Sequence, residues 1–162
     1  MNRTSIIILA GALLVLGAIN TAILRTERRI AGGRTVYLEH APVDPRSLMQ
    51  GDYMILRYRI NRQKELREDL EGHRSRGTLV LQIDEKNIAT FARIHDGSPL
   101  AENEALLRYR RRGSRITTAT DSFFFQEGRA EHYQEAKYSE LRLSPDGVAD
   151  LVALADKDLS PL

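Results

Sequence analysis

A run of 20 residues without a charged side chain, from Ser5 to Leu24, constrains this chain of 162 residues more than any other feature. As an α-helix the run would be about 30 Å long, which matches the hydrocarbon core of a bilayer. A cleaved signal peptide would have a shorter apolar region, and Asn20-Thr21-Ala22 is a poor cleavage signal. We therefore expect residues 1–30 to form an N-terminal tail and a retained single-pass anchor.

The charges beside this run give two opposite indications of orientation. Arg25, Arg28 and Arg29 follow it and only Arg3 precedes it, which by the positive-inside rule favours a cytoplasmic C-terminus. A tiny tail ahead of a single long domain is, by contrast, the usual layout of a bacterial signal-anchor. Residues 31–162 contain 20 basic and 21 acidic side chains, so the pI of about 9.0 comes from the anchor. No nucleic-acid partner is expected.

The sequence after the anchor predicts a mainly β domain over residues 31–162. Alternating apolar and polar residues indicate about eight short strands, at residues 34–41, 52–62, 78–83, 88–94, 106–112, 116–120, 138–143 and 148–154. Turn signals such as Pro145-Asp146-Gly147 separate neighbouring strands. Strands spaced this closely favour an antiparallel barrel or sandwich. In the second strand, Met54, Leu56, Tyr58 and Ile60 would share one face.

Short helices complete this prediction. We expect one helical turn over residues 47–50, closed by Gly51, a charged helix over 63–71, and a short helix within 129–137. Leu66 and Leu70 would form the apolar stripe of the second helix. The run Phe123–Phe125 is too apolar to be exposed and is expected in the core.

Two sequence blocks resemble a known family. Residues 51–58 read GDYMILRY after the lead-in PVDPRSLMQ, and a second block runs from Phe124 through Glu127, Gly128 and Tyr133 to Leu143. Together with the N-terminal helix, they closely resemble the GDYXXLXY family of bacterial membrane-anchored proteins, whose function is uncharacterised. Ser139 stands where the resemblance leads us to expect a glycine. The resemblance implies a domain on the outer side of the cytoplasmic membrane and a multi-pass membrane protein as partner.

The first block and its lead-in form a candidate site. We expect a tight corner here, made by Asp44, Pro45, Arg46, Gly51 and Asp52. This corner either has a structural role or binds an anion or a partner protein. The block also holds two tyrosines, Tyr53 and Tyr58, which point to opposite faces of a strand, so one is expected in the core and the other at the surface.

A basic face provides a second candidate. Strand alternation would place Arg108, Arg110 and Arg112 together. Such a face either protects an exposed sheet edge or binds anionic lipid headgroups.

The sequence contains none of the common catalytic motifs. The chain has no cysteine, and His40, His73, His95 and His132 lack metal-ligand spacing, so we expect no metal and no cofactor. A Ser–Lys hydrolase resembling signal peptidases would need Ser47 as nucleophile and Lys64, or a more distant lysine, as base, although the spacing differs. We expect instead a non-enzymatic accessory protein. Binding of a lipid headgroup or a small ligand is the other alternative.

Overall fold

The computed structural model describes residues 2–41, 49–50, 53–70 and 75–162, which form two compact units, Met1–Gly32 and Gly33–Leu162. The first unit is helix α1 (Arg3–Gly32), whose segment Ile7–Gly32 is long and apolar enough to cross a membrane by length and composition. The helix continues eight residues past Leu24 because no glycine or proline interrupts it before Gly32. Its polar side chains bond internally: Asn20 donates to the Leu16 carbonyl at 3.0 Å.

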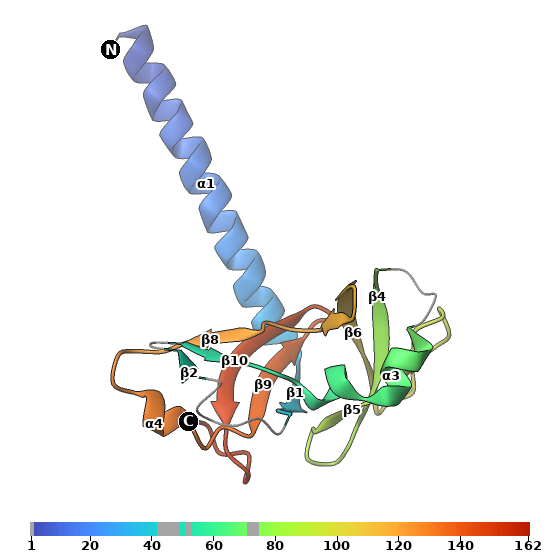
Figure 1. The fold of residues 1–162 in the computed structure, drawn as a ribbon. Helices are drawn as coiled ribbons and strands as arrows, with labels where there is room; N and C mark the ends of the chain where they lie inside the picture. The colour runs from blue at the N-terminus through green and yellow to red at the C-terminus, as the bar shows by residue number, and fades with distance from the viewer. Residues whose placement is uncertain (1, 42–48, 51–52, 71–74) are drawn as a thin grey trace. The chain divides into compact units, whose positions relative to one another are not determined.

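The second unit is built from antiparallel sheets that curl into a half-barrel, so the mainly β prediction is confirmed (Figure 1). One sheet has the order β1-β9-β10, a second β2-β3-β8, and a third β5-β4-β6-β7. The strands are β1 (Arg34–Glu39), β2 (Met49–Gln50), β3 (Tyr53–Ile55), β4 (Arg76–Ile83), β5 (Ala89–Ile94), β6 (Glu104–Arg112), β7 (Arg115–Thr117), β8 (Ser122–Phe124), β9 (Tyr138–Leu143) and β10 (Ala149–Ala155). The helical segments are η1 (Arg59–Arg62), α3 (Lys64–Asp69) and α4 (Ala130–Tyr133).

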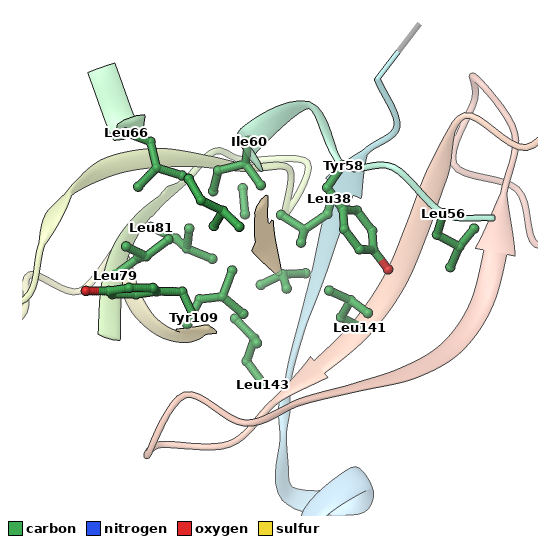
Figure 2. Close-up of a cluster of buried hydrophobic side chains, with 14 of the residues drawn as sticks. Leu38, Leu56, Tyr58, Ile60, Leu66, Leu79, Leu81, Tyr109, Leu141 and Leu143 are labelled. Atoms are coloured by element: carbon green, nitrogen blue, oxygen red, sulfur yellow. The ribbon is translucent and has the colours of Figure 1, made fainter. Parts of the chain in front are cut away.

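One hydrophobic core joins these sheets. Figure 2 shows side chains from β1, β4, β6, β9 and the segment 56–66 converging on it. Leu66 and Leu70 are completely buried, as the apolar stripe predicted. At about 25 cal/mol per Å² of apolar surface, each fully buried leucine contributes roughly 1.5–3 kcal/mol. The leucines of this core therefore fix the sheets against each other.

Two local predictions in the first motif region are wrong. Met49 and Gln50 do not belong to a helical turn but pair with Met54 and Tyr53 as strand β2. Cross-strand hydrogen bonds and burial of the β3 partner override the weak local preference for a turn. The predicted strand over 52–62 ends at Ile55 and gives way to a 3-10 turn over 59–62. Its face is nevertheless as predicted, because Met54, Leu56, Tyr58 and Ile60 are all buried.

The hairpins follow their turn signals. Gly113 between β6 and β7 has φ +58°, and Gly147 between β9 and β10 has φ +81°. The second turn also packs against β6, since the Arg108 amide donates to the Gly147 carbonyl at 2.8 Å. The turn therefore connects two of the three sheets. Ser139 lies in a regular part of β9, opposite Leu38 of β1, so the strand tolerates serine where a glycine was expected.

Candidate functional site

The two motif blocks lie side by side as strands β3 and β8. Tyr53 pairs with Phe124, and Met54 pairs with Phe123. The blocks are some 70 residues apart in the sequence, and their pairing is the geometric relation that the sequence did not indicate. The side chains around strands β3 and β8 therefore form the candidate site.

The outer side of the pair is an aromatic edge, formed by Tyr53 and Phe124. Their ring centroids lie 5.6 Å apart, and Phe124 is 73% exposed. The expectation that the whole run Phe123–Phe125 is buried is thus wrong for Phe124. Strand alternation turns Phe124 outward, whereas Phe123 and Phe125 pack against Tyr133 at 5.1 and 5.2 Å between centroids.

The second block supports this edge from within. Tyr133 ends helix α4 and is partly buried between the two inward-facing phenylalanines. Glu127 and Gly128 form a turn, in which Gly128 has φ +81° and the Arg129 amide donates to the Gln126 carbonyl at 3.1 Å. Tyr133 thus has a packing role here, and Gly128 provides the backbone conformation that leads into α4.

A polar network lies beneath the first block. The Tyr58 hydroxyl donates to the Thr120 carbonyl at 2.9 Å, and burial raises the pKa of Tyr58 to about 12. His40 forms an isolated antiparallel β-bridge with Tyr58. The Nε2 atom of His40 lies 2.8 Å from the Ser139 hydroxyl. Burial lowers the pKa of His40. Of the two motif tyrosines, Tyr58 is the core residue, and half-buried Tyr53 contributes to the aromatic edge.

An arginine-lined cavity of about 450 Å³ lies beside residues 55–58, at the end of the first block. Leu56, Tyr58 and Ile116, all buried, contribute to its wall. Its charged residues are Arg57, Arg62, Arg67, Arg115 and Asp121. Sequence reasoning missed the first three of these arginines because they become neighbours only through the turn at η1. The sequence offered one indication of this cavity, because Arg57 lies inside the first motif.

The predicted basic face also forms. Arg108, Arg110 and Arg112 alternate with inward-facing residues along β6 and are exposed. Arg110 lies opposite Arg76 of β4, and Arg112 lies opposite Arg115 of β7. Like charges in directly opposed positions destabilise a sheet. Only Arg108 of this face has a carboxylate partner among the described residues, namely Asp146.

Several predicted site residues lie outside the part of the chain that the structure describes. They are Asp44, Pro45, Arg46, Ser47, Gly51 and Asp52. The roles proposed for this corner, and for Ser47 as a nucleophile, therefore stay predictions. Lys64, the first candidate base of the hydrolase alternative, is exposed and pairs with Glu68 at 3.3 Å. Among the described residues, no group of three or more His, Cys, Asp or Glu side chains is placed to hold a metal ion.

Comparison with protein families matches residues 15–154 to the family model described as "GDYXXLXY protein". The matched region includes both motif blocks and most of helix α1. No curated protein and no solved structure matches the chain.

Proposed function

Since the chain belongs to the GDYXXLXY family, we propose that it is a membrane-anchored accessory protein, without enzymatic activity of its own, which binds a multi-pass membrane protein. The observation that carries this proposal is the aromatic edge formed by Tyr53 and Phe124. One residue of this edge comes from each motif block, so the two blocks meet at one surface.

The chemistry of the aromatic edge fits a protein partner. A phenylalanine with 73% of its surface in water loses the stabilisation that burial would give, and aromatic side chains are enriched in the cores of protein interfaces. Strand β8 is also the terminal strand of its sheet, β2-β3-β8. Its outer backbone groups therefore add a hydrogen-bonding edge to the apolar contact.

We place this interaction at a bacterial cytoplasmic membrane. Helix α1 has the length and composition of a membrane-spanning helix. In the arrangement that we propose, α1 crosses the membrane once and the β-rich unit lies in the periplasm. A partner with several membrane spans is then reachable both within the bilayer and from the outer surface.

The test is affinity purification of the full chain from membranes solubilised in mild detergent, followed by quantitative mass spectrometry. We expect a multi-pass membrane protein to be enriched with the wild type and depleted about tenfold or more with Phe124→Ser, because central aromatic residues contribute 2 kcal/mol or more to interfaces. Val152→Ser is the matched control, since Val152 is a 44% exposed apolar residue of β10.

The control should recover the partner at the wild-type level. Equal recovery with Phe124→Ser and wild type, or enrichment of no multi-pass membrane protein at all, would refute the proposal. Melting temperatures of the two variants show whether either loss is due to unfolding. Because both side chains are exposed, we expect both variants to melt close to the wild type.

A further inference from the structure

The arginine-lined cavity is a defined pocket that several segments of the chain form together. Three parts of the chain form it: residues 55–58 of the first motif, the helical segment around Asn61 to Arg67, and the β7 hairpin with Asp121. Its volume of about 450 Å³ lies in the range of small-molecule sites, about 300–1,000 Å³. Its position is distinct from the aromatic edge that carries the proposed function.

The described residues do not balance the positive charge of the cavity. Among the lining residues that the structure describes, Asp121 is the single carboxylate, and it pairs with Arg115 at 2.7 Å. The guanidinium groups of the other three arginines, Arg57, Arg62 and Arg67, make no hydrogen bond or ion pair with any residue that the structure describes. Three uncompensated guanidinium groups around one hollow repel each other, and a bound anion would remove this cost.

The wall of the cavity is held in place before any ligand binds. Leu56 and Tyr58 are 3% and 2% exposed, and the Tyr58 hydroxyl is committed to the Thr120 carbonyl. Asn61 is likewise fixed, because its Oδ1 accepts a hydrogen bond from Thr118 at 3.0 Å. A rigid floor with exposed arginine side chains around it suits a ligand whose anionic group stays near the opening and whose neutral part points inward.

We propose that this cavity binds a small phosphate-bearing anion, with Arg57, Arg62 and Arg67 as its ligands. A guanidinium fork matches phosphate oxygens with two parallel hydrogen bonds. A dianionic phosphate monoester compensates three free positive charges better than a single carboxylate does. The phosphate can come from a soluble metabolite or from a phospholipid headgroup, and both present the same group to the arginines.

Isothermal titration calorimetry of the full chain in non-ionic detergent tests this proposal. The ligands are glycerol 3-phosphate, glycerol as the neutral control, and dihexanoylphosphatidic acid as the lipid form of the same phosphate. We expect glycerol 3-phosphate to bind and glycerol not to bind. Tighter binding of the lipid by about tenfold or more identifies a headgroup as the source, and equal affinities identify a soluble ester. Each result supports the site.

Two double variants with the same change in charge locate the binding. Arg57→Gln/Arg62→Gln should weaken binding of both phosphates about tenfold or more, because a hydrogen bond to a charged group contributes roughly that factor or above. Arg76→Gln/Arg110→Gln removes two exposed arginines outside this cavity and should change affinity less than about twofold. The inference fails if neither phosphate binds, or if the two double variants lose affinity equally.

Stability provides a second readout. Since the three guanidinium groups have no partner among the described residues, Arg57→Gln/Arg62→Gln should melt at or slightly above the wild-type temperature without ligand. A lower melting temperature would show that these guanidinium groups stabilise the fold, which contradicts their assignment as free ligands. Neither readout involves the partner-capture experiment, so the two proposals succeed or fail separately.

Discussion

His40 connects strand β1 with the second motif block through both of its ring nitrogens. Nδ1 lies 3.2 Å from the Ala136 carbonyl and Nε2 lies 2.8 Å from the Ser139 hydroxyl. Because a carbonyl oxygen only accepts, Nδ1 carries the proton, and in the neutral ring Nε2 accepts from Ser139. Protonation of the ring would turn this acceptor into a donor and place a charge next to fully buried Ser139.

This geometry predicts a stability loss in mild acid. Burial lowers the pKa of His40 in the folded state below its ordinary value of 6.5. Below pH 6.5 the unfolded chain therefore binds a proton at His40 more readily than the folded chain does. The contribution of the neutral His40 ring to the free energy of unfolding is complete above pH 6.5 and decreases as the pH falls below that value. For one group the slope is at most about 1.4 kcal/mol per pH unit. Urea unfolding at a series of pH values measures it.

The histidine responsible is identified by two substitutions. His40→Gln should flatten the pH dependence of the unfolding free energy, whereas His132→Gln, at an exposed residue of α4, should leave it as in the wild type. A wild-type slope that persists in His40→Gln would show that another group causes the loss.

At the scale of elements, the turn between β9 and β10 contributes more than a reversal of the chain. A Cβ atom at Gly147 would lie 3.2 Å from the Arg108 amide nitrogen and from Leu106. Gly128 has the same φ of +81°, but a Cβ atom there would meet nothing within 4 Å. The two glycines thus separate the cost of a left-handed backbone from the cost of a close approach between elements.

We expect Gly128→Ala to destabilise the fold by about 1–2 kcal/mol, the cost of the left-handed conformation. Gly147→Ala should cost about 1–3 kcal/mol more, because overpacking against the backbone of β6 adds to the conformational cost. Chemical denaturation of both variants measures the difference. Equal costs would mean that the turn can move away from β6 freely.

The elements that the sequence predicted well are those whose local signals agree with their tertiary setting. The hairpin β4–β5, the turn at Gly147 and the stripe of Leu66 and Leu70 belong to this group. Strand β2 was missed because two residues carry no periodicity, and only the pairing of Met49 with Met54 makes them a strand. The exposure of Phe124 was not predicted, because the sequence of an apolar run does not indicate which of its side chains face outward.

The candidate site was less predictable for a related reason. Motif residues could be recognised one block at a time, but the pairing of Tyr53 with Phe124 depends on strand order, which local sequence does not determine. The arginine cavity depends on η1, where a segment that reads as a continued strand turns instead. Arg57, Arg62 and Arg67 become neighbours only after that turn.

For the whole molecule, membrane orientation is the property with the clearest test. We expect a C-terminal alkaline phosphatase fusion to be active and a C-terminal fusion to a cytoplasm-dependent fluorescent protein to be dark, because the proposed topology places residues 33–162 outside the cytoplasm. The three arginines at the end of α1 act against this orientation. An inactive phosphatase together with a bright fluorescent fusion would reverse the assignment.

The distribution of charge has a consequence for how the β-rich unit meets a surface. Residues 31–162 contain 20 basic and 21 acidic side chains. Seven of the basic residues gather around two adjoining hollows that share Thr117 and Ala119, which leaves the remainder strongly acidic. Such a body has almost no net charge, but part of its positive charge is concentrated at these two hollows. A negatively charged surface therefore orients the β-rich unit more than it attracts it. Added salt would weaken this orientation before it releases the unit from the surface.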